Sequence, residues 1–229
     1  MRKWLIRDAE EATFNVNYPG ARTLEEHIKK GIIVLDKPQG PTSHTVDAWI
    51  KEIVGIDKCS HGGTLDPKVS GVMVIALEDS TKLMPILLTS KKEYVGIVYL
   101  HKPVFEKEIR RACDELIGKI TQLPPKRSAV ARREREREIF YLEVLEIQGQ
   151  YILIKVGCQA GTYIRRLAEQ IGWKLGVGSH LLELRRTKSG MFTEDDCVTL
   201  QDLVSAFAAG EEKIREVVHP LELIGNGVG

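Results

Sequence analysis

Short apolar runs bounded by turn residues alternate along this chain with stretches whose apolar positions recur every three or four residues. The runs predict buried strands, and the recurring positions predict amphipathic helices. We expect strands at residues 31–37, 72–77, 93–100, 139–147 and 151–157. We expect helices within residues 23–30, 44–54, 104–118, 161–176 and 198–210. Because hairpins are interleaved with helices, the pattern predicts an α+β fold, with a mixed, largely antiparallel central sheet flanked by helices and loops.

In two of the predicted helices, the sequence indicates a cap residue or the residues of the buried face. Thr42 or Ser43 is suited to cap the helix at 44–54, since hydroxyl side chains accept a hydrogen bond from the free backbone amides of a first turn. The residues expected on its buried face are Val46, Trp49, Ile50 and Ile53. Gly118 is the expected C-cap of the helix at 104–118.

Composition is that of an ordinary globular protein. The chain has 229 residues, of which 43% are hydrophobic and 28% are charged. No run reaches the roughly 18 apolar residues that a membrane helix needs, so we expect no membrane partner. The four cysteines lie far apart and include no CxxC pair, which favours reduced thiols over a disulfide framework or a zinc site.

Charge is distributed unevenly, although the net charge is only +1. Residues 126–138 hold six basic and three acidic side chains, and residues 163–190 carry a local charge of +4. Residues 193–229 hold eight acidic and two basic side chains. A polyanion such as RNA would be attracted to the middle of the chain and repelled from its end. Charge runs that are merely solvated surface are the alternative.

One carboxylate stands out by its setting. The stretch His61-Gly-Gly-Thr-Leu-Asp66-Pro67 surrounds an aspartate with turn residues directly before the apolar run at 72–77. Taken alone, an aspartate that closes a turn is a sufficient explanation. The alternative is a catalytic carboxylate on a rigid mounting, with glycines that let a ligand backbone approach closely.

Six blocks in order resemble the TruB/dyskerin family of pseudouridine synthases. They are LDKPQGPTSH (35–44), HGGTLDPKVSGV (61–72), KEYV (92–95), PPKRSAV (124–130), AGTYIRRL (160–167) and GVGSHLLELRRTKSG (176–190). Several variants within these blocks are similar to the archaeal and eukaryotic dyskerin branch. The resemblance implies the pseudouridine synthase fold and an isomerase that needs neither cofactor nor metal.

The resemblance assigns the catalytic roles. Asp66 matches the catalytic carboxylate, which either adds to C1′ of the uridine or removes the C2′ proton. Tyr94 matches the tyrosine that lies against the uracil and assists proton loss from C5. Arg165 matches the arginine that pairs with the carboxylate. Arg166 is its competitor, one residue along and therefore on another face of the helix.

The resemblance also implies residues that bind the RNA substrate. His61 matches a histidine that helps to extrude the target nucleotide. Lys37 and Pro38 match the motif beneath the pocket, and Leu184 matches an apolar residue over the base. Residues 123–138 match a thumb loop that closes on RNA, with the basic side chains Lys126, Arg127, Arg132 and Arg133. Ala131 stands where the family usually has a lysine.

The resemblance implies partners and organisation as well. We expect a catalytic subunit that modifies ribosomal RNA within a box H/ACA ribonucleoprotein, bound to guide RNA and H/ACA accessory proteins. A stand-alone tRNA T-loop synthase is the first alternative, and a non-catalytic RNA-binding or assembly module is the second. The expected segments are an arm at 1–30, a catalytic domain at 31–192 and an acidic helical tail at 193–229. We expect no PUA domain, and a cytoplasmic location in an archaeon or a nucleolar one in a eukaryote.

Overall fold

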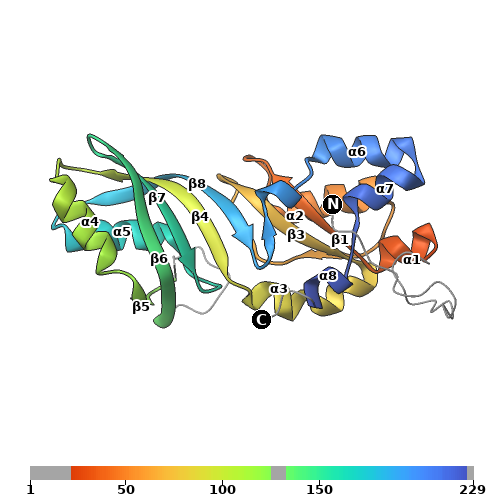
Figure 1. The fold of residues 1–229 in the computed structure, drawn as a ribbon, viewed down its shortest axis with the longest axis horizontal. Helices are drawn as coiled ribbons and strands as arrows, with labels where there is room; N and C mark the ends of the chain where they lie inside the picture. The colour runs from red at the N-terminus through yellow and green to blue at the C-terminus, as the bar shows by residue number, and fades with distance from the viewer. Residues whose placement is uncertain (1–21, 125–132, 226–229) are drawn as a thin grey trace, which may run out of the picture.

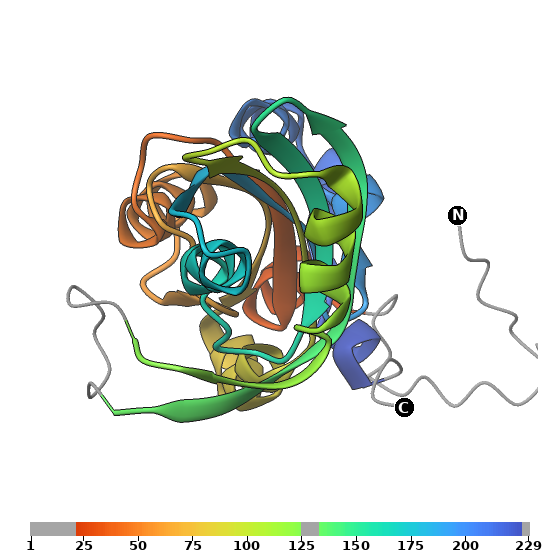
Figure 2. The ribbon, with the colours of Figure 1, turned by 90° about the vertical axis from the view of Figure 1, so that its left-hand side faces the viewer.

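A single sheet runs through the length of the molecule. The computed structural model describes residues 22–124 and 133–225. The strand order is β10-β1-β3-β8-β4-β7-β6-β5, with β2 paired to β3 and β9 paired to β8. Helices α1, α2, α6 and α7 gather around β1 and β3 at one end, and α4 and α5 lie at the other (Figure 1). Viewed from that second end, the sheet curves around α5 (Figure 2).

The sheet is mixed and mostly antiparallel, as predicted. Its strands are β1 (Gly31–Lys37), β2 (Cys59–His61), β3 (Val69–Leu77), β4 (Lys92–Leu100), β5 (Gly118–Gln122), β6 (Arg135–Gln148), β7 (Tyr151–Cys158), β8 (Ser179–Ser189), β9 (Phe192–Thr193) and β10 (His219–Pro220). The parallel contact joins β3 to β8, where Val69 to Gly71 lie opposite Leu184 to Arg186. This short contact connects the two ends of the sheet.

Helices cover the sheet in separate groups. They are α1 (Leu24–Lys29), α2 (Ser43–Val54), α3 (Met84–Thr89), α4 (Glu106–Asp114), α5 (Ile164–Lys174), α6 (Leu200–Ala209), α7 (Glu211–Val217) and α8 (Glu222–Gly225), with 3-10 turns η2 (Glu78–Leu83) and η3 (Glu194–Asp196). The Thr42 side chain caps α2 by accepting from the Thr45 amide. Helices α6 and α7 bury Leu203, Ile214 and Val217 in the core, so the acidic C-terminal region packs on the sheet.

Two large apolar clusters meet at the middle of the sheet. One lies between α4, α5 and strands β4 to β7, and the other between α2, α6, α7 and strands β1 and β3. Tyr94 and Leu184 pack against both clusters. A third cluster, on the opposite face of β1 and β3, includes Met84, Phe192 and Ile224. The junction of the first two clusters is therefore where β3, β8 and β4 come together.

The predicted strands and helices are all present, but three details differ. Helix α4 ends at Asp114, and Gly118 opens strand β5 with a φ of +97° instead of capping the helix. Trp49 is 40% exposed, because the buried stripe of α2 passes through Val46 and Ile50 and a neighbouring residue is rotated by about 100°. Strand β8 occupies Ser179–Ser189, where the apolar pattern predicts no strand.

Candidate active site

Asp66 and Arg165 form an ion pair although 99 residues separate them. Asp66 lies on the turn that leads into β3, and Arg165 lies in the first turn of α5. The Nη2 atom of Arg165 donates to Oδ2 of Asp66 at 2.5 Å. Both side chains remain about half exposed, at 56% and 51%. The carboxylate is therefore both aimed by a fixed charge and open to a ligand.

The neighbouring Arg166 points elsewhere. Its Nε donates to the backbone carbonyl of Leu123, and its guanidinium pairs with Glu169 on the same helix. Successive helical residues are separated by about 100°, so only one of the two arginines meets Asp66. The structure places Arg165 there, in the position that the sequence motif indicated.

Lys37 holds the turn that carries Asp66. The side chain is fully buried, and its Nζ donates to the carbonyls of Pro38 at 2.9 Å, Val69 at 3.0 Å and Asp66 at 3.5 Å. Burial, aided by the positive charge of Arg186, lowers the pKa of Lys37, whereas Asp66 opposes that shift. Pro38 is itself exposed and contributes its carbonyl. Lys37 thus connects the backbone of Pro38 to the backbone on both sides of the Asp66 turn.

Ser43 fixes the same turn from the start of α2. The Leu65 amide donates to Oγ of Ser43 at 2.9 Å, and this hydroxyl donates back to the Leu65 carbonyl at 3.0 Å. The Val69 amide closes the turn by donating to the Asp66 carbonyl at 2.9 Å. Bonds from two elements thus fix the backbone on both sides of Asp66, which is the rigid mounting that the sequence suggested.

Arg186 is a buried part of the site that sequence reasoning missed. It is 1% exposed, and it donates through Nε to the Val72 carbonyl at 2.7 Å and through Nη2 to the Gly63 carbonyl at 3.0 Å. Its backbone lies so close to Gly71 that a Cβ there would stand 2.1 Å from the Arg186 carbonyl oxygen. On a strand Arg185 and Arg186 point to opposite faces, but this alternation does not tell which of the two is buried.

Tyr94 and Leu184 lie on adjacent strands beside this arginine. Tyr94 of β4 is opposite Arg186 of β8, and Leu184 is opposite both Gly96 and Val69. Burial raises the pKa of Tyr94, and a hydrogen bond and positive charge from Arg186 counteract part of that shift. The phenol is therefore neutral near pH 7 and able to act as a hydrogen-bond donor.

His61 is held against α2 rather than presented to solvent. Its side chain is 9% exposed, and its Nδ1 donates to Oδ2 of Asp47 at 2.7 Å. Its Nε2 lies 3.1 Å from the hydroxyl of Thr64. The histidine thus ends β2 and contacts the Asp66 turn through Thr64, in an orientation set by Asp47, a helix residue that the sequence analysis did not single out.

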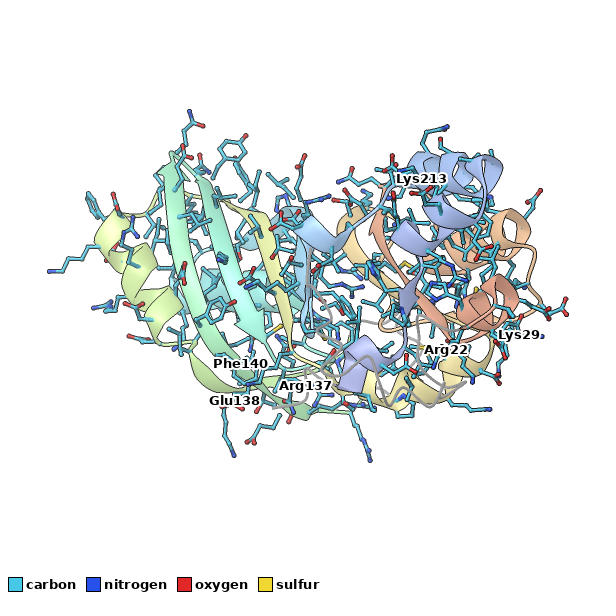
Figure 3. The ribbon with its side chains drawn as sticks, turned by 45° about the vertical axis from the view of Figure 1, so that its right-hand side comes forward. Arg22, Lys29, Arg137, Glu138, Phe140 and Lys213 are labelled. Atoms are coloured by element: carbon cyan, nitrogen blue, oxygen red, sulfur yellow. The ribbon has the colours of Figure 1, made fainter. Side chains whose placement is uncertain are left out.

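The predicted thumb is described only in part. Arg133 is exposed, whereas Lys126, Arg127 and Arg132 lie outside the described residues. Figure 3 shows the side chains of Arg137, Glu138 and Phe140 together near the first residues of β6. The Nζ of Lys91 lies 4.8 Å from the centre of the Phe140 ring. A cation and an aromatic face are therefore adjacent near the start of β6.

Asp66 itself belongs to no group of potential metal ligands in the described parts of the chain. Within residues 22–124 and 133–225, three side chains that could hold an ion gather only at His44, Asp47 and His61. No described helix is long and apolar enough to cross a membrane.

Comparison with known proteins places this geometry in a family. The family model described as the N-terminal domain of TruB family pseudouridylate synthase matches residues 51–106 and 97–164. The C-terminal domain of tRNA pseudouridylate synthase B matches residues 165–224, and the DKCLD (NUC011) domain matches residues 2–47. Together these matches extend over nearly the whole chain. The chain belongs to the TruB family.

Relatives within the TruB family are close in sequence. A Methanopyrus kandleri protein named probable tRNA pseudouridine synthase B is 54% identical over 209 residues, covering 89% of this chain and 62% of the relative. The Pyrococcus abyssi protein of the same name is 52% identical over 230 residues, covering 96% of this chain and 69% of the relative. The chain therefore spans about three fifths to two thirds of the length of these relatives.

Solved structures of the family have the same fold. A chain of the crystal structure of a Cbf5-Nop10-Gar1 complex superposes with a TM-score of 0.87 at 49% identity, covering 94% of this chain and 68% of that one. A chain of an H/ACA RNP bound to a substrate RNA containing 2′-deoxyuridine gives a TM-score of 0.83 at 47% identity, covering 90% of this chain and 64% of that one. The resemblance to the dyskerin-type branch is confirmed in sequence and in structure.

Proposed function

We propose that this chain converts uridine to pseudouridine in RNA. The observation that carries the proposal is the half-exposed Asp66 carboxylate, paired with Arg165 on a turn that Lys37 and Ser43 fix. In this isomerisation the N1–C1′ bond breaks and a C5–C1′ bond forms. The proton on C5 is lost and N1 gains one, so atoms balance without any co-reactant. One aimed carboxylate that reaches the sugar is the group that this chemistry needs.

The surrounding residues have matching roles in the proposal. Asp66 adds to C1′ as a nucleophile or removes the C2′ proton, and Arg165 keeps its carboxylate in position. Tyr94 packs against the uracil and relays the C5 proton: its oxygen accepts that proton as the phenol passes its own to solvent water, and water returns one proton to N1. Leu184 borders the same junction and supplies an apolar contact for the base. Uridine must leave its stack to reach this site, and His61 and the basic thumb residues serve that step.

For the substrate, we propose ribosomal RNA, selected by a box H/ACA guide RNA. The similarity to chains of a Cbf5-Nop10-Gar1 complex and of an H/ACA RNP supports this choice, as does the DKCLD match. Accessory proteins of the H/ACA type are then the proposed partners. Because the relatives compared above are archaeal, the proposed location is the cytoplasm. The names of those relatives favour a second candidate substrate, tRNA.

Tritium release from RNA labelled at C5 of uridine separates these substrates. One reaction contains the chain and an unmodified tRNA transcript without a guide. The other contains the chain, the accessory proteins, a guide RNA and its matched target. The proposal expects release in the guided reaction and little in the tRNA reaction. Robust release from tRNA alone would establish the stand-alone enzyme, and no release from either would refute the proposed activity.

A further inference from the structure

Three potential metal ligands converge beside the Asp66 turn. His44 and Asp47 lie one turn apart on α2, at positions i and i+3 that share a face, and His61 ends the neighbouring strand β2. The Nδ1 atoms of His61 and His44 lie 2.7 Å and 3.9 Å from Oδ2 of Asp47. One ligand atom from each of the three side chains lies within 4.8 Å of the other two. The cluster includes neither Asp66 nor Arg165.

The negative charge of the mostly buried Asp47 side chain is not balanced by a lysine or arginine among the described residues. Its side chain is 14% exposed, and its Oδ1 is buried without a hydrogen-bond partner. Among the described residues, no lysine or arginine lies within ion-pair distance of it, and its ionisable partners are the two histidines. A buried carboxylate is costly unless a cation compensates it. A protonated His61 or a bound metal ion would supply that cation.

We propose that His44, Asp47 and His61 bind a divalent first-row transition metal of the Zn²⁺ type. Two imidazole nitrogens and one carboxylate oxygen are a donor set that zinc prefers, with water completing a tetrahedral shell. Bonds of about 2.0–2.1 Å at tetrahedral angles place ligand atoms roughly 3.3 Å apart. The distances of 2.7 Å and 3.9 Å from the two histidine Nδ1 atoms to Oδ2 of Asp47 lie on either side of that value. His44 is 86% exposed, so its ring is free to turn toward the other two ligands.

Cys59 lies nearby but is not part of this donor set. Its thiol donates to the backbone carbonyl of Asp47 at 3.3 Å. The side chains whose ligand atoms converge here are His44, Asp47 and His61, without Cys59. The site is consequently a histidine and carboxylate site, which favours zinc, cobalt or nickel over the softer copper(I).

The consequence for catalysis rests on the proposed function. His61 is the residue proposed to meet the extruded nucleotide, and its Nδ1 is the atom that the metal would bind. A metal ion would hold the imidazole against α2, where the side chain is already 9% exposed. Metal binding and RNA modification therefore compete for the same side chain, and zinc inhibits turnover through this site.

A cobalt titration tests the site without any RNA. The tag-free chain is titrated with Co²⁺ in a non-chelating buffer, with the visible absorption of the bound ion as the readout and Zn²⁺ as the competitor. Asp47→Asn keeps the shape and removes the charge, and His44→Ala removes the exposed ligand. His101→Ala is the matched control, because His101 and His180 offer a second close imidazole pair, 2.8 Å apart. Circular dichroism checks that each variant is folded.

The proposal expects one Co²⁺ per chain, displaced by Zn²⁺. It expects the dissociation constant to rise at least about tenfold in Asp47→Asn and in His44→Ala, and to stay unchanged in His101→Ala. No saturable binding, or equal affinity in wild type and Asp47→Asn, would overturn it and leave a protonated His61 as the partner of Asp47. So would loss of the site in His101→Ala.

Activity with and without zinc is compared afterwards for wild type and His44→Ala. Wild type should lose activity at zinc concentrations that saturate the site, and His44→Ala should need at least about tenfold more zinc for the same fractional loss. Equal sensitivity of the two would refute the competition. If the chain modifies no RNA at all, the proposed function fails while the cobalt result still decides the metal site.

Discussion

Replacing Arg165 by alanine should affect catalysis far more than stability. The substitution removes the guanidinium that meets Asp66 at 2.5 Å. Because the two side chains are 56% and 51% exposed, solvent screens the pair, and its contribution to folding is at most about 1 kcal/mol. We therefore expect the melting temperature of Arg165→Ala to stay within a few degrees of wild type.

Turnover should respond quite differently. Loss of one preorganised charge that acts on the reacting carboxylate typically costs about 10²–10³ in rate, equivalent to about 3–4 kcal/mol of barrier. Single-turnover tritium release with enzyme in excess measures this step apart from RNA binding. We expect a loss in that range for Arg165→Ala, without a matching loss in RNA affinity.

Arg166→Ala is the matched control from the same helix. It loses a partly buried pair with Glu169 and a bond to the Leu123 carbonyl, and neither contact reaches Asp66. We expect less than about a threefold loss of turnover, which corresponds to the energy of one exposed pair. Equal losses in the two variants would refute the assignment of the arginine. A fall in the Arg165→Ala rate that is matched by unfolding would refute the separation from stability.

Three further predictions test the framework around the site. Burial lowers the pKa of Lys92 to about 7, below its value in the unfolded chain, so the unfolded chain binds more protons between these two pKa values. In urea unfolding above pH 7, the free energy of unfolding of wild type should therefore rise by about 1.4 kcal/mol per pH unit relative to that of Lys92→Met. A difference that does not change with pH would contradict this. Gly71→Ala places a Cβ 2.1 Å from a backbone oxygen at a φ of +104°, whereas the Cβ of Gly118→Ala, at a φ of +97°, meets nothing within 4 Å. The first substitution should destabilise the fold by at least about 2 kcal/mol more than the second. Equal losses of stability would count against the close β3–β8 contact. Tyr94→Phe should fold normally and lose at least about tenfold in single-turnover rate, and full activity would exclude a role for the hydroxyl.

Local pattern was sufficient for most of the fold. Apolar runs gave β1, β3, β4, β6 and β7, because each of these strands buries a continuous or alternating set of side chains. Strand β8 was not predictable from the apolar pattern, because it passes between two clusters and carries charged residues on both faces. Its sequence therefore shows neither the two-residue period of a strand nor the 3.6-residue period of a helix. Its existence depends on pairing with β3 and β4, which is a long-range effect.

In the site as well, residues marked by local sequence motifs were predictable, and contacts between distant segments were not. Asp66 and Arg165 were predictable because a motif marked each of them, and helical geometry decided between Arg165 and Arg166. The burial of Arg186 was not predictable, since the carbonyls that compensate it belong to Val72 and Gly63, more than a hundred residues away. The contact of His61 with Asp47 likewise appears only when α2 and β2 are packed together.

Asp66 is the residue on which the proposed chemistry depends most. The most direct measurement is tritium release from C5-labelled uridine RNA, in the guided reaction, by wild type, Asp66→Asn and Asp79→Asn. Asp79 is the control because its carboxylate is also about half exposed and paired with a cation, Lys82, at 3.1 Å. We predict release by wild type and Asp79→Asn, and a loss of several orders of magnitude for Asp66→Asn with RNA affinity retained. An Asp66→Asn protein that kept more than about a tenth of wild-type release would contradict the assignment of Asp66 as the catalytic carboxylate.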